Sequence, residues 1–353
     1  MLKSIHLQNF RSYKKADFNF SEKSTLIVGP NTIGKSNLLE AIFLISTGKS
    51  FRTEKDFQML EQGKEVGRVS AMVDDLKLEV VITNGNVGGV KSQYKKFLVN
   101  GVAKRRVDFA GNLLSVLFSP SDLDIIVDSP TLRRNFLDNV LEQVDREYRV
   151  ASIAYVKALR QRNALLELAR ETGARNEKQL EYWDSLVIEN GQIITSKRNQ
   201  FIDFVNSAKK DIFEFIILYD KSLISKERLD QYKVEERLSG VTLVGPHRDD
   251  FSIQMKGKHI ANDVKYFGSR GQQRLAILQL KALEITFIEE KMGKRPLLLL
   301  DDIFSELDSG HINLVLEKAG KQQTIITTTH KEFVGKLFLK QMEVIELENG
   351  KKD

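Results

Sequence analysis

The feature that most constrains the fold is an eight-residue loop, Gly29-Pro-Asn-Thr-Ile-Gly-Lys-Ser36, which matches the pattern G-x-x-x-x-G-K-[ST]. A β-type run at residues 25–28 precedes it, and residues 37–45 have the apolar spacing of a helix. A strand, a loop and a helix in this order direct backbone N–H groups and a helix N-terminus at phosphate oxygens. The pattern therefore predicts a P-loop, in which ATP contacts Gly29, Pro30, Asn31, Thr32, Ile33, Gly34, Lys35, Ser36 and Asn37.

The chemistry of ATP needs a magnesium ion and an acidic group beside the P-loop. Lys35 is expected to reach the β- and γ-phosphates, and the Ser36 hydroxyl is expected to ligate Mg²⁺. Residues 296–300 form an apolar run that ends in Asp301 and Asp302. We expect Asp301 to act at the magnesium ion and Asp302 to orient or deprotonate the attacking water.

A second phosphate-binding surface is indicated at Ser269, Arg270, Gly271 and Gln272, just before a helical segment at 271–290. A serine hydroxyl, a glycine N–H and a helix N-terminus favour an anion, although Ser269 with Gln272 also fits an ordinary capping box. A further β-type run at 324–328 leads to His330, which we expect to sense the γ-phosphate. The expected catalytic residues are therefore Lys35, Asp302 and His330.

These elements, in this order, resemble the ABC ATPases. The resemblance implies an α/β fold, namely an ABC-type P-loop ATPase head in which a mixed sheet combines a parallel core with antiparallel strands. It implies that Ser305 and Asp308 communicate between two heads. It also implies that Ser269-Arg-Gly-Gln faces the nucleotide of a second subunit, so that the competent unit is an ATP-dependent homodimer.

The chain divides by pattern into a discontinuous ATPase lobe, residues 1–118 and 240–353, and an inserted helical lobe, residues 119–239. Residues 2–10 alternate as a strand does. Further strands are expected at 66–73, 76–83 and 94–99, separated by turn-like residues at 74–75 and 84–86. Two apolar stripes have helical spacing, one from Tyr148 to Ala169 and one from Leu180 to Phe215. They predict either a short helical hairpin with Gly173 in its turn or a helical bundle packed against the head.

Composition sets limits on the partners. The chain has 353 residues, no cysteine and a net charge of +6, with a pI of about 9.1. Disulfides and thiolate metal sites are excluded, and a nucleic-acid partner is compatible with the charge. No apolar run approaches the roughly 18–20 residues that cross a bilayer, and the N-terminus lacks the apolar stretch of a signal peptide. We expect a cytoplasmic protein without a membrane partner.

More specific segments show similarity to the RecF family of bacterial recombination-repair proteins over nearly the whole chain. They are Leu7-Gln-Asn-Phe-Arg-Ser-Tyr13, Asn37-Leu-Leu-Glu-Ala-Ile42, Lys49-Ser-Phe-Arg-Thr53, Phe118-Ser-Pro-Ser-Asp-Leu123, Gly245-Pro-His-Arg-Asp-Asp250, Ser269-Arg-Gly-Gln-Gln-Arg274 and Leu299-Leu-Asp-Asp-Ile-Phe-Ser-Glu-Leu-Asp308. The departures are Thr32-Ile33, which are stiffer than the residues usual there, and Ser121 in place of Glu. No residue is assigned to the ABC Q-loop.

The RecF resemblance implies an ATP-dependent DNA-binding protein of recombinational repair and replication-fork maintenance. It would bind single-stranded or gapped DNA or single-strand/duplex junctions, help recombinase loading with RecR- and RecO-type mediators, and support SOS induction. Slow hydrolysis by a weak ATPase would reset it. Arg11 is expected beside the nucleotide or at the solvent-facing end of a strand, and His247-Arg248-Asp249 is expected to pin two elements together.

Other functions share the ATP chemistry. The nucleotide-binding subunit of a membrane transporter is disfavoured by the helical insert and by Ser-Arg-Gly-Gln-Gln in place of Ser-Gly-Gly-Gln. An ATP-dependent nuclease would need a further acidic metal domain. An ATP-binding structural clamp with little turnover remains an alternative, because a hydrolysis rate cannot be read from sequence. The DNA-contacting residues stay unassigned.

Overall fold

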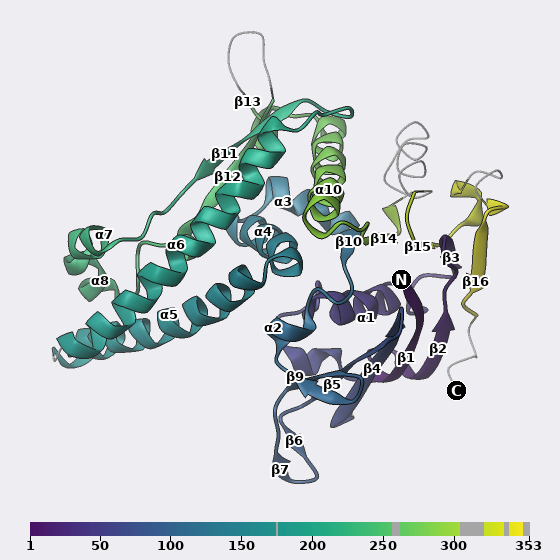
Figure 1. Cartoon of the computed structure of the whole chain (residues 1–353), viewed down its shortest axis with the longest axis horizontal. Helices are drawn as coiled ribbons and strands as arrows, with labels where there is room; N and C mark the ends of the chain where they lie inside the picture. Colours follow the sequence, from purple (N-terminus) through teal and green to yellow (C-terminus); the bar gives the residue numbers. More distant parts are fainter. Residues whose placement is uncertain (174–175, 256–261, 304–320, 335–338, 349–353) are drawn as a thin grey trace. The chain divides into compact units, whose positions relative to one another are not determined.

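The computed structural model describes residues 1–173, 176–255, 262–303, 321–334 and 339–348, and the chain forms two compact units (Figure 1). Unit 1 contains Met1–Pro120 and Ile288–Asp353, and unit 2 contains Ser121–Phe287. The chain returns to unit 1 at Ile288, whereas the sequence analysis predicted the return at residue 240. The reason is that the strand and helix that follow residue 240 share the apolar core of unit 2.

The first sheet of unit 1 is antiparallel, as the alternating pattern predicted. Its order is β2-β1-β4-β5-β8-β9, and its strands are β1 (Leu2–Phe10), β2 (Tyr13–Asn19), β4 (Val66–Val73), β5 (Leu76–Thr83), β8 (Lys95–Val99) and β9 (Val102–Lys104). A small separate hairpin joins β6 (Asn86–Val87) to β7 (Val90–Lys91). Alternate side chains of β1 and β4 are buried, which is the pattern of a sheet with one covered face.

The second sheet of unit 1 is parallel, with the order β10-β14-β15-β3-β16. Its strands are β10 (Ser115–Phe118), β14 (Leu297–Asp301), β15 (Thr324–Thr328), β3 (Ser24–Val28) and β16 (Met342–Glu346). The register pairs Asp301 with Thr327 and Thr328 with Val28. The carboxyl ends of β3, β14 and β15 therefore meet at one sheet edge, where α/β proteins bind their ligands.

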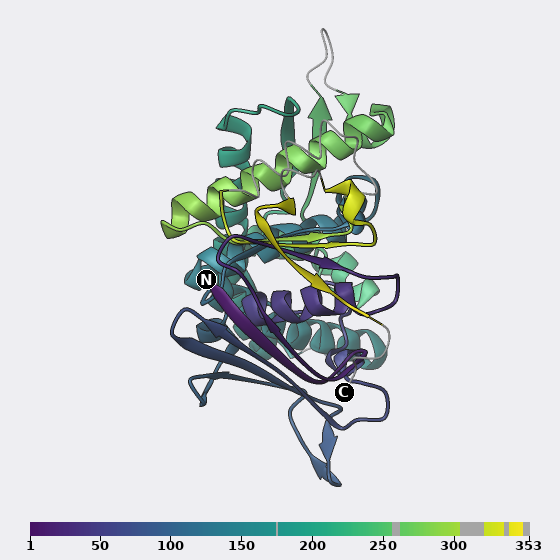
Figure 2. The same cartoon turned by 90° about the vertical axis from the view of Figure 1, so that its right-hand side faces the viewer.

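Helix α1 (Lys35–Thr47) lies between the two sheets of unit 1 (Figure 2). Its residues from Leu38 to Thr47 are all buried, because the helix contacts β4 and β5 on one side and β14 and β15 on the other. A helix that is covered on all sides is apolar all round, and residues 38–45 of α1 satisfy this with one exception, Glu40. Unit 1 also contains the short helix α2 (Arg106–Phe109).

Unit 2 combines helices with a three-stranded sheet of order β11-β12-β13. Helices α5 and α6 pack against each other as a hairpin. The elements are α3 (Asp124–Val127), α4 (Pro130–Val144), α5 (Arg146–Thr172), α6 (Glu177–Ser207), β11 (Phe215–Asp220), α7 (Lys226–Gln231), α8 (Lys233–Ser239), β12 (Asp250–Met255), β13 (Asn262–Asp263), α9 (Val264–Phe267) and α10 (Arg270–Met292), whose last residues belong to unit 1.

The predicted second helix, from Leu180 to Phe215, was too long. Helix α6 ends at Ser207, and Phe215 lies in β11. The Asn206 side chain binds the backbone N–H and C=O of Ile217, which fixes β11 beside the helix end. In the described part of the chain no helix is long and apolar enough to cross a membrane.

Candidate functional site

The P-loop joins β3 to α1, as the sequence predicted, and its geometry requires a glycine at position 34. Gly34 has φ +121°, and a Cβ there would lie 2.7 Å from the Tyr13 hydroxyl oxygen. That hydroxyl donates a hydrogen bond to the Gly34 carbonyl at 3.0 Å. Burial raises the pKa of Tyr13, so the hydroxyl stays protonated and holds the loop. Thr32 also has a positive φ of 69°.

Lys35 begins α1 and is turned back over the loop. Its Nζ donates to the carbonyl oxygens of Gly29 at 2.7 Å and Pro30 at 3.0 Å. Burial lowers the pKa of Lys35, while the charges of Asp302 and Asp301 oppose that shift. Within the described residues the ammonium group therefore bonds to neutral carbonyl acceptors at the mouth of the loop, which the oxygens of a polyphosphate would replace.

The two acids after β14 meet the start of α1. The Ser36 hydroxyl donates to Asp301 Oδ1 at 2.9 Å, and the Thr327 hydroxyl donates to the same oxygen at 2.8 Å. Asp302 has a positive φ of 48°, and its N–H is fixed by the carbonyl of Thr327 at 3.1 Å. Burial raises the pKa of Asp302, whereas nearby Lys35 lowers it. The structure thus gathers four of the predicted site residues, Lys35, Ser36, Asp301 and Asp302.

His330 lies just beyond β15, at the same sheet edge. Its N–H is held by the Thr328 hydroxyl at 3.3 Å, and its side chain is 64% exposed. The imidazole Nδ1 is 3.8 Å from the Glu332 carboxylate, and His330 is among the groups that favour the charged form of Asp302. Its place is compatible with contact to a bound phosphate, and that role stays a prediction.

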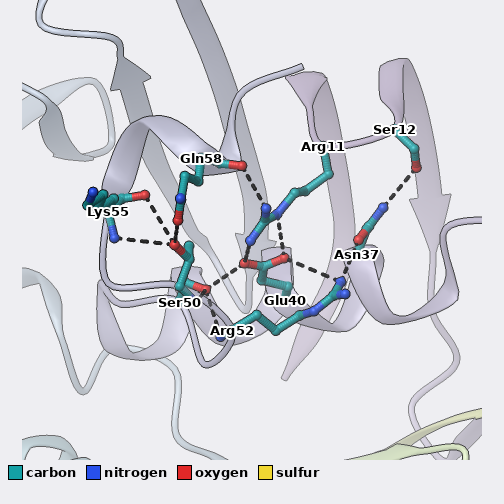
Figure 3. A network of polar contacts seen from close by, with 9 residues as sticks. Arg11, Ser12, Asn37, Glu40, Ser50, Arg52, Lys55 and Gln58 are labelled. Carbon is teal, nitrogen blue, oxygen red and sulfur yellow. Dashed lines mark hydrogen bonds and ion pairs between the residues drawn. The ribbon is translucent and has the colours of Figure 1, made fainter. Parts of the chain in front are cut away.

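Arg11 forms an ion pair with Glu40, which the sequence analysis did not predict (Figure 3). Its guanidinium makes two bonds to the Glu40 carboxylate, at 2.8 Å and 2.6 Å, and one to the Gln58 carbonyl at 2.6 Å. Glu40 is fully buried on α1 and also accepts from the Ser50 hydroxyl, with the Arg52 guanidinium 3.9 Å away. A contact of Arg11 with the nucleotide stays a prediction.

Asn37 links the same network to the P-loop helix. Its amide donates to the Ser12 hydroxyl at 2.9 Å and accepts from Arg52 at 2.8 Å (Figure 3). Sequence reasoning missed Glu40 and Arg52. The available signal was a lone acid on an otherwise apolar helix, since a buried carboxylate requires a cation.

The segment from Ser269 to Gln272 forms the exposed N-terminus of α10 in unit 2. The Ser269 N–H donates to the Gln272 side chain at 2.9 Å, and the Gln272 N–H donates to the Ser269 hydroxyl at 3.3 Å. This is a reciprocal capping box. A Cβ on Gly271 would meet only the Ser269 hydroxyl, at 3.9 Å, among the described residues. Ser305 and Asp308 lie outside the described residues.

The segment Pro246–Arg248 and the two aspartates after it have partners inside unit 2. His247 Nδ1 is 2.7 Å from the Tyr155 hydroxyl. Asp249 is fully buried, accepts from Arg198 at 3.0 Å and from Tyr219 at 2.5 Å, and so fixes β11 to α6. These contacts agree with the structural role expected for the segment.

The whole chain, residues 1–353, matches the family described as RecF/RecN/SMC N terminal domain. The DNA replication and repair protein RecF of Rippkaea orientalis is 34% identical, with 99% of this chain and 98% of that protein covered. The protein of the same name from Exiguobacterium sp. is 35% identical with the same coverage.

Solved structures agree with these sequence matches. The structure described as the recombination mediator protein RecF-ATP in the RecFOR pathway superposes with a TM-score of 0.84 and 34% identity over 95% of this chain and 93% of that one. The Smc head domain of Pyrococcus yayanosii, at 13% identity, covers 98% of this chain and 94% of that one with a TM-score of 0.53, and shows a shared fold alone.

Proposed function

This chain belongs to the RecF family, and from that premise we propose that it is an ATP-dependent DNA-binding protein of recombinational repair and replication. The observation that carries the proposal is the meeting of Ser36 with Asp301 at 2.9 Å, beside Lys35 and Asp302. A P-loop and a strand-end acid in hydrogen-bond contact are the parts that ATP chemistry needs. The relatives named RecF, including one solved with ATP, support the same assignment.

Magnesium fits the donors that are present. Mg²⁺ prefers oxygen ligands, keeps several waters, and is held through one or two carboxylates together with substrate phosphates. The Ser36 hydroxyl and the Asp301 carboxylate supply such oxygens on adjacent elements. When bound, the ion would neutralise charge on the phosphates. The chain's own residues would position it, with Thr327 orienting Asp301 by a 2.8 Å hydrogen bond.

Asp302 is the group that we assign to the attacking water. Its carboxyl follows directly after the Asp301 ligand, and its backbone is fixed to Thr327. Burial raises the pKa of Asp302, which makes the carboxylate a better proton acceptor than an exposed aspartate. We infer a weak ATPase, in which hydrolysis acts as a reset of the DNA-bound state.

The segment from Ser269 to Gln272 would complete the site of a second copy. It is exposed, it begins a long helix, and Gly271 leaves open space in front of the first turn. Helix N-termini bind anions through free N–H groups and the helix dipole. Two copies that each present this segment to the other's ATP would form an ATP-dependent homodimer.

DNA is the proposed partner of that dimer, in single-stranded, gapped or junction form. The net charge of +6 favours binding through phosphates, so the affinity should fall steeply with salt. RecR- and RecO-type mediators are the proposed protein partners, since the solved relative is described as part of the RecFOR pathway.

Sedimentation with and without ATP and Mg²⁺, each with and without gapped DNA, tests the proposal. The wild type should dimerise with ATP and bind the DNA only in that state. Ser269→Arg should bind ATP but stay monomeric, whereas Ser185→Arg, at an exposed position of α6, should behave as the wild type. Lys35→Arg should lose ATP-driven assembly. A wild type that dimerises but ignores DNA would favour a transporter-type ATPase, and one that stays monomeric with ATP bound would contradict the dimer.

A further inference from the structure

A groove of about 600 Å³ lies in unit 1 between β2 and β16. The two strands run side by side in Figure 1. The apolar lining of the groove includes Ala16, Phe18, Ile33, Ile345 and Leu347. Two residues assigned above also line it, namely Ile33 of the P-loop and Tyr13, which holds Gly34.

Both walls of the groove are strand edges. β2 is the last strand of the antiparallel sheet, and β16 is the last strand of the parallel sheet. In the described part of the chain each pairs with a strand on one side only. A sheet edge presents unpaired N–H and C=O groups, which another extended segment can bind.

The rim of the groove is acidic although the chain as a whole is basic. Asp17, Glu343, Glu346 and Glu348 line it, against the single cation Lys15. Lys331 pairs with Glu346 and His6 lies 2.7 Å from Asp17. Among the described residues the four acids still outnumber Lys15 and Lys331. The chain's net charge is +6, so this local reversal of sign selects a positively charged occupant and disfavours nucleic acid.

The groove also adjoins the first residues of the P-loop. A Cβ on Gly29 would lie 2.9 Å from the Leu347 carbonyl oxygen and 3.1 Å from Ile33 Cγ2. The Leu347 N–H bonds to the Val28 carbonyl at 2.8 Å. The bulky Ile33 at this loop position therefore has a local explanation, because its side chain forms part of the groove's apolar lining.

We propose that this groove is a docking site for a partner protein, which inserts an extended segment with alternating basic and apolar side chains. The segment adds a strand to the free edge of β16. Residues two apart share a face of a strand, so the segment's apolar face covers Ile345 and Leu347 and its basic face meets Glu348 on the opposite side. Glu343, which shares a face with Ile345, adds to the negative charge at this edge. This interaction surface is separate from the ATP-driven dimerisation proposed above.

A fluorescein-labelled hexapeptide, Lys-Val-Lys-Ile-Lys-Val, tests the proposal by anisotropy on the nucleotide-free full chain. Because no nucleotide is present, the result does not depend on whether the protein binds ATP. We expect saturable binding by the wild type and none by the peptide with Glu in place of Lys. The double variant Glu343→Lys/Glu348→Lys should weaken binding by at least about tenfold. The matched double variant Glu54→Lys/Asp75→Lys, at exposed acids outside the groove, should change it by less than about twofold.

A peptide N-methylated at every residue separates strand addition from simple charge attraction. It keeps every side chain but loses backbone donors, so it should fail to bind if the segment adds to β16. Equal binding of the methylated or the acidic peptide overturns the proposal. So does undiminished binding by Glu343→Lys/Glu348→Lys, or the absence of saturable binding at about 1 mM peptide.

Discussion

His247→Gln is expected to remove a pH-dependent part of the stability of unit 2. The His247 ring lies between the Tyr155 hydroxyl, at 2.7 Å from Nδ1, and the Thr242 carbonyl, at 3.1 Å from Nε2. The carbonyl can only accept, so Nε2–H donates to it and Nδ1 accepts from Tyr155. Burial, together with the nearby charges of Arg248, Arg134 and Arg162, lowers the pKa of His247 to about 4.

The sign and size of the effect follow from linkage. The ordinary pKa of histidine is 6.5, so between about pH 6.5 and 4 the unfolded chain binds a proton that the folded chain does not. Stability therefore falls as the pH drops through this window. At about 1.4 kcal/mol per pH unit, the loss is at most about 3 kcal/mol.

Urea unfolding of the wild type and of His247→Gln, at several pH values from about 4.5 to 7.5, measures the loss. The difference between the two proteins is the diagnostic quantity, because Glu284 acts in the opposite direction. Burial raises the pKa of Glu284 to about 7, so its contribution falls as the pH rises. The wild type should lose about 2–3 kcal/mol more than the variant on acidification, and His6→Gln, at a partly exposed histidine, should follow the wild type. A constant difference between wild type and His247→Gln across the window would refute the reasoning.

Three further substitutions test the site and its scaffold. Asp302→Asn should lower phosphate release at least about 100-fold while the ATP-bound dimer persists in sedimentation. Normal hydrolysis by this variant would exclude Asp302 as the base. Gly34→Ala should abolish ATP binding in calorimetry, because its Cβ would lie 2.7 Å from the Tyr13 hydroxyl; wild-type affinity would show that the loop can adjust. Arg198→Met should lower the free energy of unfolding by about 3–5 kcal/mol, since it leaves the fully buried Asp249 without its cation. A loss below about 1 kcal/mol in urea unfolding would show that this ion pair is dispensable.

The strands of unit 1 were predictable because their patterns are local. Alternation placed β1 at its observed ends, Leu2–Phe10. Turn-like residues at 74–75 and 84–86 bounded the predicted strands 66–73 and 76–83, which match β4 and β5. The P-loop and the Asp301 strand end were predictable for another reason, since phosphate and magnesium demand particular residue types at fixed spacing. Their meeting at one sheet edge then follows from parallel pairing.

The parts that sequence could not supply depend on contacts far apart in the chain. Apolar residues continue past Ser207 at helical spacing, yet Phe215 belongs to a strand because it pairs with Met255, forty residues later. The same pairing holds β12 in unit 2. The predicted boundary between the two lobes at residue 240 therefore differs from the observed one, which lies between Phe287 and Ile288. Arg11 could not be assigned a partner for a similar reason, since Glu40 is twenty-nine residues away in sequence.

The fold of a single chain does not explain why residue 271 is a glycine. Gly34 has a steric cause within the chain, whereas Gly271 has open space and lies in the first turn of α10. Glycine in a helix costs about 0.5–1 kcal/mol relative to alanine, so Gly271→Ala should stabilise unit 2 slightly in urea unfolding. If the open space admits the phosphates of a second copy's ATP, the same variant should lose ATP-driven dimerisation in sedimentation. A variant that is more stable and still dimerises as the wild type does would show that residues 269–272 serve only as a helix cap.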